Sequence, residues 1–305
     1  MNIMNLINAL PGAVAQGLIW GIMAIGVYIT FRILDIADLT VDGTLCTGGA
    51  VCIMLMQSGQ NVWVAMAGAL AAGMLAGMAT GLLHTFMGIP AILAGILTQL
   101  GLYSVNLKIM GKANQAINVD KFDLMVSLRY IKGVPFYKNT ILIVASVIVV
   151  LILILYWFFG TELGCSLRAT GCNDRMARAQ GINTDLNRVL GLMISNGLVA
   201  VSGALLGQYQ GFADVNMGRG AIVIGLAAVI IGEAVFGRVF RNFGFRLLAV
   251  AFGSIIYYFV LQIVIWLGVD TDLLKLLSAV VVAVFLAIPT WKSRYFSRTA
   301  GKGGV

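Results

Sequence analysis

The sequence predicts an all-α polytopic membrane protein with about nine or ten membrane-spanning helices. The 305-residue chain is 60% hydrophobic and only 10% charged. Its mean hydropathy is +0.97, and a soluble domain, which is about 45–50% apolar, could not bury this excess. The apolar residues also form runs near the roughly 20 residues that a spanning helix needs. Because backbone groups in lipid must be satisfied within the segment, runs of this length predict helices and not a barrel.

Nine apolar runs are candidates for the spanning helices, and two of them are short. In chain order they are Ala13–Thr30, Thr44–Met56 (short), Val62–Leu83, Pro90–Leu107, Thr140–Phe159, Val189–Tyr209, Ala221–Phe236 (short), Gly244–Trp266 and Asp272–Pro289. We therefore expect a transmembrane domain over residues 13–290, an N-terminal segment at 1–12 that could carry a lipid-surface helix, and a basic tail at 291–305. Such a chain belongs in the cytoplasmic membrane.

The distribution of basic residues predicts the orientation, since cytoplasmic connections carry the excess of Lys and Arg. A cytoplasmic C-terminal tail puts Arg238, Arg241, Arg32 and a polar stretch near residue 175 on the same inner side. With nine spans the N-terminus lies outside, and a tenth span would reverse that end. The outer loop 111–139 opposes the assignment because it is also basic; it holds Lys112, Lys121, Arg129, Lys132 and Lys138.

Small residues recur at helical spacing in two of the predicted spans. The third span has Gly73, Gly77 and Gly81, and the sixth has Gly203 and Gly207. Glycines four residues apart let helix backbones approach closely in a membrane, where the hydrophobic effect no longer drives helix association. We expect tight internal helix contacts at these positions.

The chain lacks the motifs of an enzyme. It contains no GxxxxGK[ST] phosphate-binding loop, no GxSxG and no HExxH. Its single histidine, His84, and four scattered cysteines cannot form a metal cluster. Its net charge of +8 is spread over short connections, which does not favour nucleic-acid binding. We expect no cofactor or metal in this chain.

A polar island, residues 171–188, interrupts the apolar pattern with five charged side chains: Asp174, Arg175, Arg178, Asp185 and Arg188. Asn173 is a favourable N-cap, Asp174 suits the positive end of a helix dipole, and Gly181 suits the position after a helix. These signals predict a two-turn helix over Asp174–Gln180, with Arg175 and Arg178 on one face. Taken alone, the island is either a docking element or a solvated connection.

Three segments resemble the permease subunits of branched-chain amino-acid and ribose type ABC importers. The longest is GCSLRATGCNDRMARAQGINTDLNRVLGLMISNGLVAVSGALLGQYQG, which is similar to the segment with the coupling helix. GLIWGIMAIGVYITFRILDIADLTVDGTLCTGGAV is similar to the first span, and GIPAILAGILTQLGLY to the entry of a later one. The matches in the coupling segment are Gly164, Arg168, Ala169, Gly171, Asn173, Ala177, Gly181, Ile182 and Asn183, followed by Ala200, Ser202, Gly203 and Gly207.

The resemblance covers most of residues 13–290 and implies a type II-like ABC importer fold with a cytoplasmic coupling loop at 160–188. It also implies a second permease copy, two ATPase subunits that bind ATP-Mg, and an extracellular lipoprotein or periplasmic binding protein. The substrate would be a small polar solute; similarity to tryptophan/tyrosine-type permeases favours an aromatic or branched-chain amino acid, with a sugar or nucleoside as alternatives. The implied ATPase-coupling residues are Asn173, Asp174, Arg175, Met176, Arg178, Ala179 and Gly181.

The chain departs from the family pattern at two positions. Arg175 lies near the place of the acidic residue in older coupling loops, so charge pairing with the ATPase would differ. Glu233 stands where the family commonly has glycine.

Polar residues within the spans are candidates for the substrate pathway, since polar groups in a membrane core are costly and often face a cavity. They can equally bond neighbouring helices. The candidates are Gln99, Tyr103 and Asn106 on one face of the fourth span, Asn196 and Ser202 in the sixth, and Glu233. We interpret the charged residues at the end of the first span as an interfacial turn whose charged groups have partners: Arg32, Asp35, Asp38 and Asp42. The rival function is an ion-coupled secondary transporter that uses Glu233 or the Asp35/Asp38 pair.

Overall fold

The computed structural model describes residues 3–268, except 120, 123, 129–138, 238 and 241, together with 273, 276, 279–280, 282–284 and 287. The N-terminal half contains α1 (Ile3–Tyr28), the π-helical turn η1 (Ile29–Ile33), α2 (Thr40–Gln57), α3 (Val62–Thr85), α4 (Ala91–Met110) and β1 (Asn114–Ala116). The rest contains α5 (Thr140–Gly160), α6 (Glu162–Cys172), α7 (Asp174–Ala179), α8 (Thr184–Gln210), β2 (Phe212–Asp214), α9 (Ala221–Phe236) and α10 (Phe243–Trp266).

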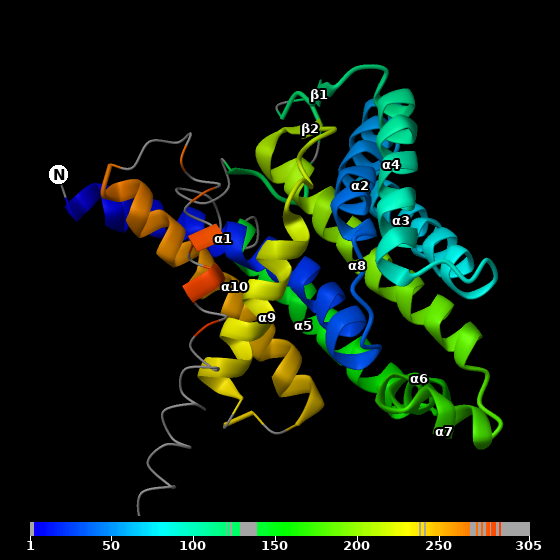
Figure 1. Cartoon of the computed structure of the whole chain (residues 1–305). Coiled ribbons are helices and arrows are strands. Elements are labelled where there is room, and N and C mark those ends of the chain that lie inside the picture. Colours follow the sequence, from blue (N-terminus) through cyan, green and yellow to red (C-terminus); the bar gives the residue numbers. More distant parts are fainter. Residues whose placement is uncertain are drawn as a thin grey trace, which may run out of the picture.

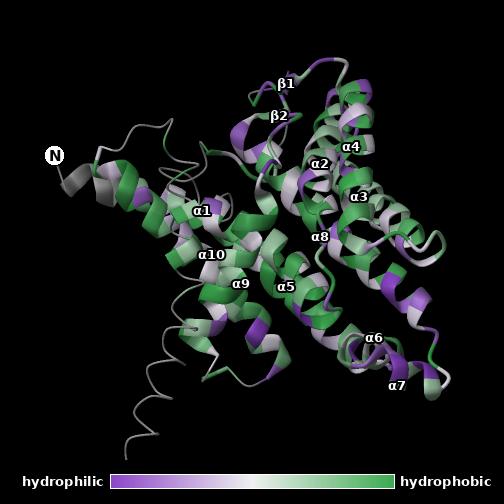
Figure 2. Cartoon of the chain, viewed as in Figure 1, coloured by the Kyte–Doolittle hydropathy of each residue, from purple (hydrophilic) through white to green (hydrophobic). Residues whose placement is uncertain are grey.

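The helices form two packed groups that meet along α8 (Figure 1). One group contains α2, α3 and α4, and the other contains α1, α5, α9 and α10. The antiparallel pair β1–β2, with Gln115 opposite Ala213, lies at one end of the bundle, and α6 and α7 lie at the other. Figure 2 shows the intervening helices as mostly hydrophobic, with hydrophilic residues concentrated at α7 and at the start of α8.

Six helices in the described part of the chain are long and apolar enough to cross a membrane. They correspond to the predicted first, third, fourth, fifth, sixth and eighth spans. The two short predictions are also helices: α9 has the predicted bounds, and α2 begins four residues earlier than predicted. Residues 272–289, the predicted ninth span, fall almost wholly outside the described residues, as do the tail at 291–305 and most basic residues of the loop 111–139.

The first span differs from its predicted bounds. α1 begins at Ile3 and includes Pro11, so much of the predicted N-terminal segment belongs to the same helix and no separate lipid-surface helix precedes it among the described residues. At its other end the helix continues through η1 to Ile33. Apolar side chains on both sides of Pro11 favour one continuous helix, and proline is tolerated in membrane helices whose neighbours complete the local bonding.

The predicted close packing at glycines is confirmed around α8. A Cβ at Gly73 would lie 2.5 Å from Asn196 O, and a Cβ at Gly81 would lie 2.9 Å from Val189 Cα. Gly77 of α3 contacts the backbone of Leu192 in α8. Gly203 of α8 contacts the backbone of Leu45 in α2. α8 is therefore held between α2 and α3 at distances that larger side chains do not allow.

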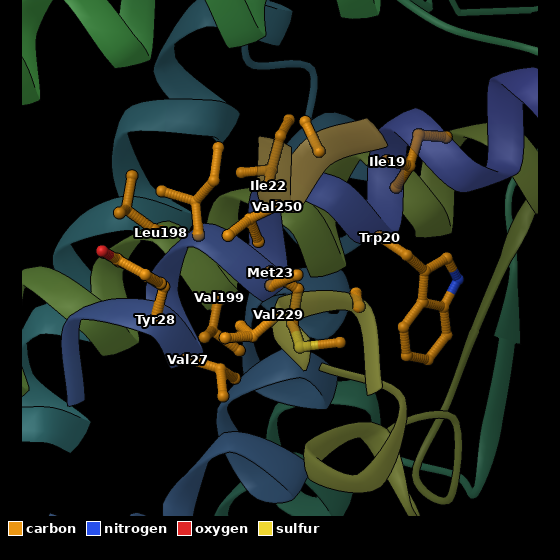
Figure 3. Close-up of a cluster of buried hydrophobic side chains, with 14 of the residues drawn as sticks. Ile19, Trp20, Ile22, Met23, Val27, Tyr28, Leu198, Val199, Val229 and Val250 are labelled. Atoms are coloured by element: carbon orange, nitrogen blue, oxygen red, sulfur yellow. The ribbon is translucent and has the colours of Figure 1, made fainter. Parts of the chain in front are cut away.

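The other side of α8 packs into the main apolar core. Figure 3 shows Ile22, Met23 and Val27 of α1 among Leu198 and Val199 of α8, Val229 of α9 and Val250 of α10. These side chains are all at least nine-tenths buried. This core joins the two groups of helices, so a displacement at one end of α1 has a packed path to α8, α9 and α10.

Candidate functional site

The polar island forms the capped helix that the sequence predicts. Asn173 Oδ1 accepts a hydrogen bond from Met176 N at 3.1 Å, which caps the start of α7. The helix ends at Ala179, one residue before the predicted end, and Gly181 follows with a φ of +81°. Ile182 N then donates to Ala177 O at 3.1 Å. Hydrogen bonds from adjacent residues thus cap both ends of this two-turn helix.

Four charged side chains brace α7 against the start of α8. Arg178 donates from Nε to Thr184 Oγ1 at 2.7 Å and from its terminal nitrogen to Asp185 Oδ1 at 2.9 Å. Arg188 lies 3.3 Å from Asp174 Oδ2, which also lies 3.6 Å from Arg178. A network of this kind holds its members more firmly than an isolated surface pair does. Arg178 thus stabilises the island internally, and its predicted contact with an ATPase stays a prediction.

The outward surface of the island combines one charge with apolar side chains. Arg175 is exposed and has no ion-pair partner among the described residues. Met176 is 63% exposed and Leu186 54% exposed. Ala179 and Gly181 are exposed beside them. An exposed methionine and leucine around a free cation suit a protein contact better than a purely solvated loop does.

Backbone contacts tie the island to the end of the first span. A Cβ at Gly171, in the last turn of α6, would overlap the carbonyl group of Ile33 and lie 3.0 Å from Leu34 Cα. Asn187 Nδ2 donates to Thr170 Oγ1 at 3.1 Å, which joins α8 to α6. Arg168 donates to Phe159 O and lies 5.2 Å from the ring centroid of Phe243. The last turn of α6, just before the island helix, is therefore in direct backbone contact with the end of η1.

A cavity of about 620 Å³ lies between the island and the segment after η1. Asp35, Ala37, His84 and Ile92 contribute to its wall, as do Asn173, Asp174 and Arg188 of the island. Asp35 has a φ of +55°, a strained conformation for a residue other than glycine. The chain turns sharply here because it leaves a membrane helix and starts α2 deeper in the bundle.

A second cavity, here called the central cavity, has a volume of about 230 Å³. It brings together Gln99, Tyr103 and Asn106 of α4, as the spacing on one helix face predicts. Asn106 is 1% exposed, whereas Tyr103 is 42% exposed. The remaining wall comes from Asp42, Gly43, Leu100, Val215 and Arg219.

Two charged residues of the central cavity were not predicted as site residues. Asp42 lies in the first turn of α2, and its carboxylate accepts hydrogen bonds from Gly220 N at 2.9 Å and Ile222 N at 3.0 Å. It thereby caps the start of α9. Arg219 is exposed and, within the described part of the chain, forms no ion pair. The available signals were a carboxylate inside an apolar segment and an arginine between two glycines just before a span.

Asn196 and Ser202 join helices in this conformation and do not line the central cavity. Both side chains are fully buried. Asn196 donates to Asp38 Oδ2 at 2.7 Å and accepts from Thr44 Oγ1 at 2.8 Å, while Ser202 donates to Ile19 O at 2.7 Å. Burial raises the pKa of the Asp38 carboxyl above its ordinary value, against hydrogen bonds from Thr40 and Asn196. Asn196 and Ser202 therefore bond neighbouring helices, which is the second of the two roles that the sequence leaves open.

Glu233 lies near the end of α9 and pairs with Arg32 in η1. The two side chains form a bidentate ion pair with distances of 2.6 and 2.8 Å. The pair is partly accessible, with 53% of Arg32 and 29% of Glu233 exposed. Although the sequence places Glu233 within an apolar run, the fold puts it beside a cation at a helix end. It does not line the central cavity.

Comparison with known proteins assigns the family. The family model described as branched-chain amino acid transport system / permease component matches residues 10–289. A tyrosine transport system permease protein of Clostridioides difficile (strain R20291) is 37% identical over 282 residues, covering 92% of this chain and 91% of that protein. The uncharacterized protein RP368 of Rickettsia prowazekii (strain Madrid E) is 36% identical and covers 92% of this chain and 97% of its own length.

A solved structure supports the fold. The structure of PsaBC from Streptococcus pneumoniae in complex with Fab matches with a TM-score of 0.53 at 18% identity, covering 94% of this chain and 95% of that chain. The predicted fold class, an all-α polytopic membrane protein with a type II-like ABC importer fold, is thereby confirmed. The chain belongs to the branched-chain amino acid transport system permease family, and it is a multi-pass membrane permease of an ABC importer.

Proposed function

We propose that this permease imports an amino acid as a homodimer driven by two separate ATPase subunits that bind its polar islands. The observation that carries the proposal is α7: a capped helix, braced by four charges and fixed to the end of the first span, that presents Arg175 and Met176 outward. The chain has no GxxxxGK[ST] loop of its own, which fits ATP-Mg binding on the partner subunits.

The proposed substrate is an aromatic or branched-chain amino acid. The 37% identical relative is named as a tyrosine transport permease, and the alignment covers nine-tenths of both chains. A lipoprotein or periplasmic binding protein would deliver the amino acid to the end of the bundle with β1 and β2. This end is proposed to face outward, with the island and the C-terminal tail in the cytoplasm, because cytoplasmic loops retain basic residues.

The proposed mechanism needs a rigid link between the ATPase and the spanning helices. Closure of the ATPase subunits would displace α7, and the contact of Gly171 with Ile33 would pass that displacement to α1. Since an equilibrium shifts only when a partner binds its two states with different affinities, the ATPase must bind the inward- and outward-open forms unequally. The four-charge brace supports this role because it keeps α7 from moving independently of α8.

The role of the outer face of α7 can be tested with Arg175→Glu. We expect this charge reversal to reduce ATPase capture and uptake by about tenfold, as expected when a contact worth about 1.4 kcal/mol is lost. Capture would be measured by pulling down the tagged permease from native membranes. Uptake of labelled tyrosine would be measured in the same cells.

Lys112→Glu is the matched control, since Lys112 is also exposed but lies beside β1 at the opposite end of the bundle. It should leave ATPase capture unchanged. If Arg175→Glu and the wider Arg175→Glu/Arg178→Glu variant retain full capture and uptake, the island does not bind the ATPase.

The ion-coupled alternative makes a different prediction for Glu233. In the structure this carboxylate neutralises Arg32, so Glu233→Gln is expected to keep uptake within about twofold, as for a partly exposed ion pair. The exchanged pair Arg32→Glu/Glu233→Arg should behave similarly. Uptake would be measured in energised vesicles with and without an ion gradient; collapse of uptake in Glu233→Gln, or dependence on the gradient without ATP, would favour an ion-driven carrier.

A further inference from the structure

We propose that the central cavity is a recognition site for the two charged groups of an α-amino acid, an inference that rests on the proposed amino-acid import. Arg219 would bind the carboxylate, and Asn106 Oδ1, beside Asp42, would accept hydrogen bonds from the ammonium group. Leu100, Tyr103 and Val215 would contact the side chain. All six residues line this one cavity of about 230 Å³.

The cavity lies where two helices begin inside the bundle. A Cβ at Gly43, in the first turns of α2, would lie 3.2 Å from Gln99 Cα, near the middle of α4. α9 begins at the same level, because Asp42 caps it. Non-helical backbone within a membrane domain is tolerated only where it is buried in protein or lines a cavity. Helices that begin within a membrane domain point their positive ends at such a cavity.

Asn106 supplies a polar atom that the protein leaves unsatisfied. The residue is 1% exposed, and its Nδ2 donates to Gly43 O at 3.4 Å, a long hydrogen bond. Its Oδ1 has no hydrogen-bond partner. Because a buried acceptor without a donor destabilises a fold, this arrangement points to a ligand donor. The N–H groups of an ammonium ion fit that position.

Arg219 supplies the complementary charge. It lies just before α9, where its backbone N donates to Asn216 O at 3.1 Å. Among the described residues Arg219 forms no ion pair with the nearby Asp42, and each Asp42 oxygen keeps a free lone pair beside its hydrogen bond from the backbone at the start of α9. A guanidinium binds a carboxylate through two parallel hydrogen bonds. A cavity lined by Arg219 together with Asp42 and Asn106 matches a zwitterion better than an uncharged sugar.

The remaining wall is apolar and aromatic. Leu100 is 64% exposed and Tyr103 42% exposed, so both side chains offer surface that a ligand can cover. Val215 closes the cavity from the β2–α9 connection. Such a wall favours a large apolar or aromatic side chain, because apolar surface leaves water on binding.

Binding can be measured by the protection of a cysteine placed in the cavity. Leu100→Cys would be made together with Cys165→Ser and Cys172→Ser, since Cys165 and Cys172 are the exposed native thiols. The full assembled transporter in membranes would be labelled with a small maleimide. We expect millimolar L-tyrosine to slow labelling, while tyramine, which lacks the carboxylate, and D-fructose do not.

Substitutions then identify the groups responsible. In the same background, Arg219→Gln and Asn106→Leu are expected to weaken protection by tyrosine about 10-fold to 100-fold, the effect of losing a charge-assisted hydrogen bond. Arg219→Lys should recover part of it. Lys112→Gln is the control for loss of one exposed cation near the same end of the bundle. Asn106→Leu removes an unsatisfied polar atom, so its thermal stability should be equal to or above that of the parent.

Uptake by the same variants separates the two proposals. If the parent protein imports no amino acid, the proposed function is wrong. If it imports tyrosine, but Arg219→Gln and Asn106→Leu import at the parent rate and keep full protection, only the recognition site is wrong. Equal protection by tyrosine and tyramine, or protection by fructose, would also overturn this assignment. A fall in uptake together with a loss of stability in Asn106→Leu would show a structural role and overturn it for Asn106.

Discussion

Gly171→Val is expected to reduce amino-acid uptake at least about tenfold while ATP hydrolysis by the assembled transporter continues. A Cβ at this position overlaps the backbone carbonyl of Ile33, so α6 must move away from η1. Overpacking of this kind costs about 1–3 kcal/mol, and a contact weakened by more than about 1.4 kcal/mol reduces coupling at least tenfold. Uptake and phosphate release would be measured on the same membranes, to give the number of amino acids imported per ATP.

The control for Gly171→Val is Gly160→Val. Gly160 is the last residue of α5, close to the island in sequence, and a Cβ there meets nothing within 4 Å. Its uptake per ATP should equal that of the parent. If both variants transport normally, the contact between α6 and the first span does not transmit the movement of α7. If Gly171→Val fails to capture the ATPase at all, the contact serves assembly and not coupling.

Gly77→Leu is expected to prevent formation of a stable permease. Gly77 contacts the backbone of Leu192, and a Cβ there would also lie 2.9 Å from Met193 Cα. Since backbone atoms cannot rotate away, α3 and α8 must separate along an interface that also includes Gly73 and Gly81. We expect a destabilisation of about 3 kcal/mol or more, the upper part of the range for overpacked sites. Fluorescence-detected size exclusion and thermal melting in detergent would measure it.

Gly101→Leu provides the comparison for this second substitution. Gly101 lies within α4, is exposed, and has open space where its Cβ would be. Leucine has the higher helix propensity by nearly 1 kcal/mol, so Gly101→Leu should be neutral or stabilising. Equal melting temperatures for Gly77→Leu and Gly101→Leu would show that the α3–α8 contact contributes little to stability.

Local signals predicted the island well. Asn173 and Gly181 close a helix that begins at Asp174, because capping depends only on residues a few positions apart. The interface glycines were predicted for a similar reason, since spacing along one helix shows which face carries small side chains and can approach a neighbouring helix closely. The partner of Arg178 was not predicted: on an isolated helix it shares a face with Arg175, but in the fold it turns to Thr184 and Asp185.

The polar residues inside the spans were the hardest to assign. Gln99, Tyr103 and Asn106 meet one cavity as their helical spacing predicts. Asn196, Ser202 and Glu233 have the same polar character, yet they bond to Asp38, Ile19 and Arg32 from distant parts of the chain. Hydropathy cannot separate these two groups, because it reports the cost of burying a polar atom and not the partner that offsets it.

The sequence by itself determined that the chain lies in a membrane, that its spans are helical, and that a capped polar helix interrupts them. These properties follow from composition, run length and short-range spacing, which act within a single segment. Only the tertiary structure decided that Asp42 caps α9, that Arg219 shares a cavity with Asn106, and that Gly171 contacts Ile33. Those pairs are far apart along the chain, so their meeting depends on how whole helices pack, which no local pattern contains.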